Sequence, residues 1–191
     1  MEKGRLEAFS DGVIAVIITI MVLELKPPHG EALSDLLVLL PTFSAYVLSF
    51  IFVGIYWVNH HHFFQIIKKV SGGMLWANNH LLFWLSLIPF TTAWMGESHL
   101  ATVPVALYAL NLLGCAVAYT IMSIVTLRTH GPESEIAKAI GRDKKGKISL
   151  GIYILALPMA FFAPLISCAM FLIVSFIWLV PDSRVERMFG P

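Results

Sequence analysis

The polar residues that could do chemistry gather near one carboxylate, Asp11, which lies inside the first apolar run of the sequence. An ionisable group within an apolar run of membrane length is costly to bury, and such groups are usually paired or functional. Arg5 lies six positions earlier, roughly 240° around a helix, so the two side chains do not share a face. We therefore expect the partner of Asp11 on another helix. Candidate donors stand near the ends of the next two apolar runs: Trp57, Asn59, His60, His61, His62, Asn78, Asn79 and His80.

Three kinds of chemistry fit these residue types. The first is a buried polar cluster that holds the first helix against the second and third. The second is a proton relay through Asp11 and a histidine. The third is a metal site, which is disfavoured because the adjacent His60, His61 and His62 point in different directions on a helix. No paired carboxylates and no nucleophile with a base fall at membrane depth, so the sequence predicts no enzyme and no cofactor.

The composition decides what surrounds these residues. Of the 191 residues, 58% are hydrophobic and only 13% are charged, whereas soluble domains are usually about 25% charged. A soluble protein of this size would lack the polar groups to cover its surface. The formal net charge of +1 provides no basic field for nucleic acid. The sequence therefore predicts an all-α integral membrane protein, with the lipid bilayer as its surroundings.

Six apolar runs are candidates for membrane-spanning helices, each of which needs roughly 20 residues. The last two runs are short, and Pro164 between them indicates a tight helical hairpin. We read residues 1–191 as a single domain. Its expected spans are 5–25, 36–60, 74–95, 101–127, 148–163 and 165–180.

The basic residues predict the orientation, because cytoplasmic loops carry an excess of Lys and Arg. In a six-span chain Lys26 is alone on the outer side. The others fall at the two termini and in the second and fourth loops: Lys3, Arg5, Lys68, Lys69, Arg184 and Arg187, with the rest in 128–147. We therefore expect a multi-pass protein of the cell membrane with both termini cytoplasmic.

The first span also carries an uncharged stripe. Val16, Thr19 and Leu23 are spaced i, i+3 and i+7 and share one face of a helix. Asp11 falls roughly 140° from Val16, away from that stripe. Glu24 follows at the outer mouth, where a negative charge attracts cations.

With these residues in view, the sequence resembles the transmembrane protein 175 family of potassium channels. The resemblance rests on Arg-x-x-x-Phe-Ser-Asp at 5–11, on Gly-Val-x-Ala-x-x-x-Thr at 12–19 and on Leu-Glu-Leu at 23–25. It extends to the six-span plan over the whole chain and is closest to the short prokaryotic members.

The resemblance implies one six-helix unit per chain and a homotetramer around a central pore lined by the first helix. It implies no potassium-channel signature loop, and Thr-Val-Gly-Tyr-Gly does not occur in the sequence. The motif residues Arg5, Phe9, Ser10 and Asp11 would be structural and pack against the second and third helices. Val16 would form the hydrophobic constriction, with Thr19 and Leu23 as the next layers. Isoleucine or leucine is more usual at the first layer, so the narrowest ring could lie at Val16 or at Leu23.

The function expected from this outline is a modestly potassium-selective cation channel, with K⁺ as the permeant ion. The alternative is a proton-coupled secondary transporter or a proton pathway through Asp11 and the nearby histidines. Such a transporter would need broken helices, which Pro89, Pro104 and Pro158 could supply. It would also need a charged residue near the midplane, and no acidic residue falls mid-span.

Overall fold

Every regular element that the structure describes is a helix, and the all-α prediction is thereby confirmed. The computed structural model describes residues 2–67, 69–131, 133–134, 137 and 143–179. Five basic residues of the orientation argument lie outside the described residues: Lys68, Lys138, Arg142, Arg184 and Arg187. So does the end of the last expected span, at residue 180. The helices are α1 (Lys3–Leu23), α2 (Leu33–Leu37), α3 (Leu40–Gln65), α4 (Gly72–Ser86), α5 (Ile88–Glu97), α6 (Thr102–His130), α8 (Lys144–Phe162) and α9 (Pro164–Leu179).

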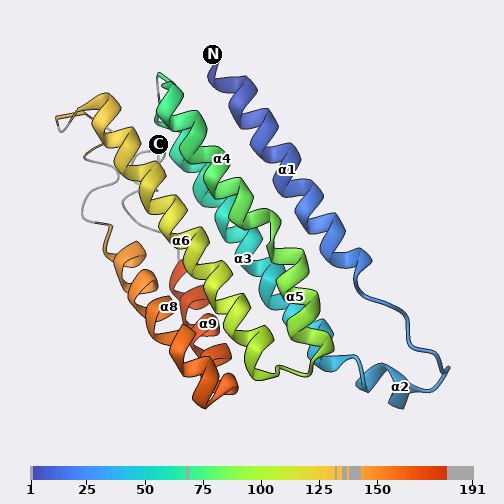
Figure 1. Cartoon of the computed structure of the whole chain (residues 1–191). Coiled ribbons are helices and arrows are strands. Elements are labelled where there is room, and N and C mark those ends of the chain that lie inside the picture. Colours follow the sequence, from blue (N-terminus) through green and yellow to red (C-terminus); the bar gives the residue numbers. More distant parts are fainter. Residues whose placement is uncertain (1, 68, 132, 135–136, 138–142, 180–191) are drawn as a thin grey trace.

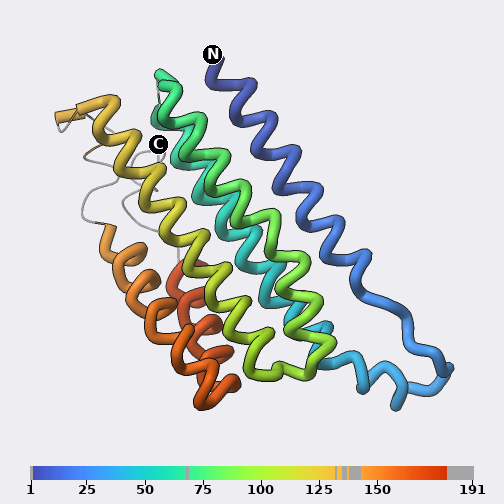
Figure 2. The backbone as a smooth tube through the Cα atoms, in the orientation of Figure 1, coloured from blue at the N-terminus to red at the C-terminus, as the bar shows by residue number. Residues whose placement is uncertain are grey.

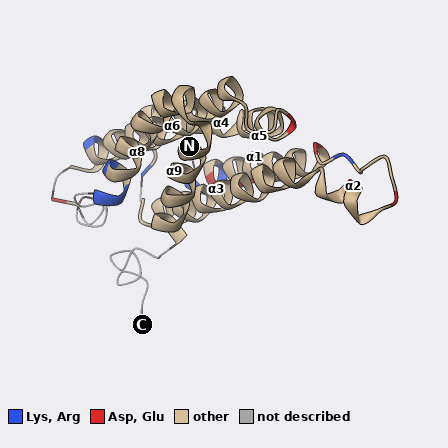
Figure 3. Cartoon of the chain, turned by 90° about the horizontal axis from the view of Figure 1, so that it is seen from below, with Lys and Arg blue, Asp and Glu red and all other residues tan. Residues whose placement is uncertain are grey.

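The longer helices run side by side in one bundle (Figure 1). Among the described residues, α1, α3, α6 and α8 are each long and apolar enough to cross a membrane, and α9 is a shorter apolar helix of 16 residues. Seen from one end, the Lys, Arg, Asp and Glu residues gather near helix ends and connections (Figure 3). This arrangement is that of a multi-pass membrane protein, because charged groups are costly within the hydrocarbon region.

The third expected span, 74–95, is divided between α4 and α5, although the chain runs on in the same general direction (Figure 2). The break has a local cause, because Pro89 at the second position of α5 has no N–H to donate. At the break, a backbone carbonyl and a backbone N–H lack a partner within the helix, and the side-chain amide of Asn111 on α6 forms hydrogen bonds with both. In the amide orientation that suits its neighbours, it donates to the Trp84 carbonyl at 2.8 Å and accepts from the Ile88 N–H at 3.2 Å. The kink is therefore a hydrogen-bonded feature of the fold.

The second expected span, 36–60, appears as a separate short helix α2 followed by α3, whose second residue is Pro41. Proline favours the first turn of a helix and so marks where α3 begins. Asp35 fixes α2 locally, because its Oδ2 accepts a hydrogen bond from the Ala32 N–H at 3.0 Å. At its other end α3 continues to Gln65, since helical hydrogen bonding does not stop where the hydrocarbon region ends.

Helix α1 lies at one edge of the bundle, and α8 and α9 lie at the opposite edge (Figure 1). Helix α1 packs against α3, α4 and α5 through one face only. Ile14, Ile17 and Met21 on that face are at most 3% exposed. The other face of α1 has no cover within the chain, and the candidate site begins there.

Candidate functional site

The uncharged stripe of α1 points away from the rest of its own chain. Val16 is 54% exposed and Leu23 is 77% exposed, and Thr19 between them is exposed as well. The Thr19 hydroxyl donates to the Val16 carbonyl at 2.8 Å, which leaves its oxygen lone pairs as acceptors. A helix with one buried face and one uncovered apolar face needs lipid or another copy of the chain against the uncovered side.

A buried polar cluster fastens the other face of α1 to α3 and α4. The Ser10 hydroxyl donates to the Leu6 carbonyl at 2.9 Å and accepts from Asn78 Nδ2 at 3.0 Å. Asn78 Oδ1 lies 2.8 Å from His60 Nε2, and because an amide oxygen only accepts, the histidine nitrogen donates. Ser10, Asn78 and His60 are at most 1% exposed. Every polar atom of these bonds is therefore paired, as a buried cluster requires.

Asp11 makes a separate contact nearer the surface of the chain. The indole Nε1 of Trp57 donates to Asp11 Oδ1 at 3.0 Å, and Trp57 is 45% exposed. His61 stacks on the Trp57 ring at a centroid distance of 6.0 Å. Among the described residues, no hydrogen bond joins Asp11 to a histidine. The carboxylate thus binds α3 through an indole, whose N–H is a donor only.

The other candidate partners turn elsewhere. Asn59 Nδ2 donates to the Ile55 carbonyl of its own helix at 2.8 Å, and His80 Nε2 accepts from Trp84 Nε1 at 3.0 Å. Asn79 is exposed. Neighbouring positions on a helix face different directions. Asn78 therefore bonds to Ser10 of α1 while Asn79 is exposed, and His60 joins the cluster through Asn78.

The motif residues Arg5 and Phe9 are also on the uncovered side of α1. Arg5 is exposed and Phe9 is 57% exposed. Within the chain, their packing against the second and third spans is thus slighter than the resemblance implied. The reason is geometric, since Ser10 occupies the direction that faces α4 and its preceding neighbour points about 100° away.

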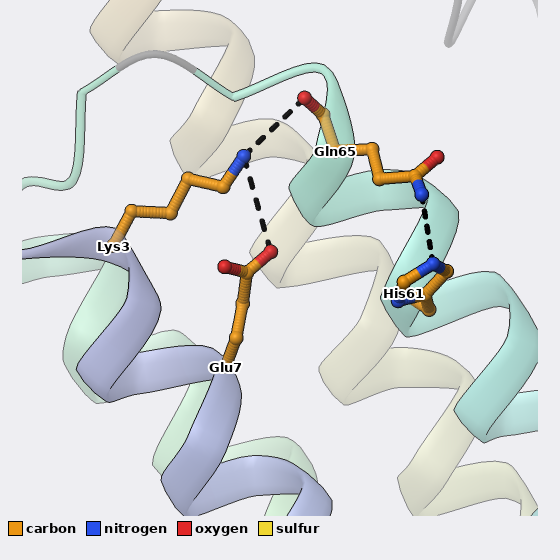
Figure 4. Close-up of polar contacts among 4 residues, drawn as sticks. All are labelled: Lys3, Glu7, His61 and Gln65. Atoms are coloured by element: carbon orange, nitrogen blue, oxygen red, sulfur yellow. Dashed lines mark hydrogen bonds and ion pairs between the residues drawn. The ribbon is translucent and has the colours of Figure 1, made fainter. Parts of the chain in front are cut away.

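A further set of contacts, at the end of the bundle where α1 begins, joins Lys3 and His61 to Glu7 and Gln65, two residues that the sequence analysis did not name (Figure 4). The Lys3 ammonium lies 3.9 Å from Glu7 Oε1 and donates to the Gln65 carbonyl at 3.3 Å. The Gln65 amide donates to His61 Nε2 at 2.7 Å. The i, i+4 spacing of Lys3 and Glu7 was a readable signal for the first contact. The bond to Gln65 required knowledge of how α1 and α3 align.

At the other end of α1, Glu24 follows the helix as its C-terminal cap residue and is exposed. Glu24 lines a cavity together with Lys26 and Glu97, and the Lys26 Nζ lies 3.4 Å from Glu97 Oε1. Within the part of the chain that the structure describes, no group of three or more His, Cys, Asp or Glu is placed to hold a metal ion.

Comparisons with known proteins decide the family. A family model described as "Endosomal/lysosomal potassium channel TMEM175" matches residues 5–89, which include the Ser10, Asn78 and His60 cluster. A protein of Chryseobacterium sp. (strain P1-3) named a potassium channel is 54% identical over 187 residues, covering 98% of this chain and 97% of that protein. The chain belongs to the TMEM175 family. Because the family model describes a channel, the prediction that this chain is no enzyme is confirmed.

Other TMEM175 relatives extend the comparison. The crystal structure titled as a lysosomal potassium-selective channel TMEM175 homolog from Chamaesiphon minutus superposes with a TM-score of 0.82 at 28% identity, covering 94% of this chain and 97% of that one. The human protein named endosomal/lysosomal proton channel TMEM175 is 31% identical over 101 residues, which are 47% of this chain and 20% of the human protein.

Proposed function

We propose that this chain is a potassium-selective cation channel whose pore is lined by α1 of four copies. The observation that carries the proposal is the uncharged stripe of Val16, Thr19 and Leu23, which is exposed while the opposite face of α1 is buried. The TMEM175 family match and the potassium-channel names of its relatives support potassium as the permeant ion. A four-fold axis turns one stripe into rings of four side chains, so one helix per chain suffices for a pore.

The rings of side chains explain how such a pore would favour potassium over sodium. Val16 and Leu23 carry no ligand atoms for an ion, so they would gate by diameter and by exclusion of water. Four Thr19 hydroxyl groups would offer oxygen acceptors between them. Potassium sheds its hydration water at lower cost than sodium, so a narrow and weakly coordinating passage favours potassium modestly. Glu24 at the outer end would raise the local cation concentration.

The remaining parts of the chain would support this role. In the proposed topology α1, α3, α6, α8 and α9 each cross the cell membrane, and α4 with α5 makes one further crossing, so both termini lie in the cytoplasm. The buried cluster of Ser10, Asn78 and His60 and the Asp11–Trp57 bond would set the rotation of α1, because they fasten its inner half at two points.

Proton transport through Asp11 has weaker support. A relay needs consecutive groups that both accept and donate protons, and Asp11 meets the Trp57 indole, which only donates. The buried histidine, His60, is bonded to Asn78 instead.

The proposal is tested with purified protein in potassium-loaded liposomes, where a proton ionophore lets potassium leave in exchange for protons. We expect potassium efflux well above that of potassium-loaded vesicles without protein. We also expect a smaller cation efflux from sodium-loaded liposomes that contain the protein. Flux no greater than that of empty vesicles, from protein shown to be folded and oligomeric, would contradict the channel.

A further inference from the structure

A cavity away from α1 lies between α3, α6, α8 and α9 in the half of the bundle where α8 begins. None of its lining residues belongs to α1. The cavity has a volume of about 40 Å³. A single water needs roughly 10–15 Å³ by that measure, so the cavity has room for a few waters or for one group of similar size.

Aromatic rings form much of its wall, contributed by Tyr56, Tyr119, Tyr153 and Trp178 among others. Their positions are fixed by neighbours. Tyr56 and Tyr119 meet edge to face at 6.4 Å, and Trp178 Nε1 donates to Ser149 Oγ at 2.9 Å. Tyr153 is only 2% exposed as a whole residue, and it lines the cavity together with the partly buried Tyr56. A phenol hydroxyl both donates and accepts, so the tyrosines that line the cavity can offer hydrogen bonds to a ligand inside it.

One charged residue, Asp143, completes the lining. Its Oδ1 accepts from the Gly146 N–H at 3.0 Å and so caps α8. A carboxylate has further lone pairs beyond this bond. The cavity therefore combines one negative charge, several aromatic rings and hydroxyl oxygens.

We propose that this cavity binds a small ammonium cation, of the kind carried by choline or ethanolamine. Ring faces and a carboxylate both attract positive charge, and aromatic cages with an acidic residue suit ammonium groups. The Asp143 carboxylate disfavours an anion in the same place. A bare metal ion is a poorer fit, since one carboxylate and a few hydroxyl groups offer too few oxygens against a largely aromatic wall. The reachable volume limits the ligand to a head group rather than a larger molecule.

The test measures thermal unfolding of the purified full-length protein in detergent with potassium chloride held constant. Choline chloride is titrated in, and sodium chloride at the same ionic strength is the reference. At ten times the dissociation constant we expect choline to raise Tm by about 3–5 °C above the sodium reference. Equal Tm values in choline and sodium at every concentration would overturn the proposal.

Two variants locate the effect. Asp143→Asn keeps a good capping residue and removes the charge, so we expect it to abolish the choline shift. Asp35→Asn is the matched control, since Asp35 also accepts from a backbone N–H but lies on α2, away from the cavity. If Asp143→Asn does not fold, Tyr153→Phe is expected to weaken choline binding several-fold. A choline shift unchanged in the folded variants would overturn the proposal.

The ammonium could come from a lipid head group or from a free molecule, and nanodiscs separate the two sources. With a lipid head group as ligand, free choline stabilises the protein in phosphatidylglycerol nanodiscs but adds nothing in phosphatidylcholine nanodiscs. With a free molecule as ligand, the shift is the same in both. No shift in either lipid would contradict the proposal.

Discussion

At the scale of single residues, the polar cluster of Ser10, Asn78 and His60 shows what a sequence can and cannot predict. Residue type and membrane depth were enough to expect a polar contact between the first helix and the second and third spans. The choice of Asn78 over Asn79, and of His60 over His61, depends on the rotation of each helix by about 100° per residue. That rotation is set by packing across the bundle, which the local sequence does not contain.

Removing the Ser10 hydroxyl tests whether the cluster holds α1 in place. In Ser10→Ala the Nδ2 of the buried Asn78 loses its acceptor, which should lower the free energy of unfolding by about 1–3 kcal/mol. Thermal unfolding in detergent measures this. The matched control is Ser86→Ala, whose hydroxyl is exposed and bonds to its own helix at the Phe83 carbonyl. If both variants unfold at the same temperature as the unchanged protein, the cluster contributes no stability.

At the scale of helices, the apolar runs indicated where the chain crosses the bundle, and the differences lie at proline and polar residues. Pro89 divides the third expected span into α4 and α5, and Asn111 on α6 satisfies the break. The sequence supplied the proline, but the amide that accommodates it lies on another helix. Likewise α2 became a separate helix because the chain turns before Pro41.

Close contact between α3 and α5 gives a prediction at this scale. A Cβ added at Gly96 would lie 2.6 Å from the Thr42 Cα, so Gly96→Ala forces backbone to move and should cost roughly 1–3 kcal/mol. Gly151→Ala on α8 is the control, because a Cβ there meets nothing within 4 Å. The unfolding temperatures of the two variants in detergent are compared. A Gly96→Ala protein as stable as Gly151→Ala would show that this contact is looser than described.

At the scale of the whole molecule, the uncovered face of α1 needs lipid or another copy of the chain against it, and no property of the single chain decides between the two. The composition indicates an integral membrane protein, but it does not set the number of chains in the complex. The proposed four-fold arrangement rests on the family resemblance, because closing rings around an axis does not by itself set the number of copies.

The number of copies has a direct measurement. Native mass spectrometry of the detergent-solubilised complex should give four times the 21.2 kDa of one chain, apart from bound lipid or detergent. A complex of two chains would not surround an axis with four copies of Val16 and Leu23, and it would contradict the proposed pore.

The central claim, that the exposed stripe of α1 lines the ion path, is tested most directly by shortening its side chains. Potassium and sodium flux into liposomes is compared for Val16→Ala, Leu23→Ala and the matched control Leu155→Ala, whose side chain is 62% exposed on α8. We predict that widening either α1 ring raises the flux several-fold and lowers the preference for potassium, because the constriction is relieved. Leu155→Ala should change neither quantity. If the two α1 variants behave like the control, the stripe does not face the ions.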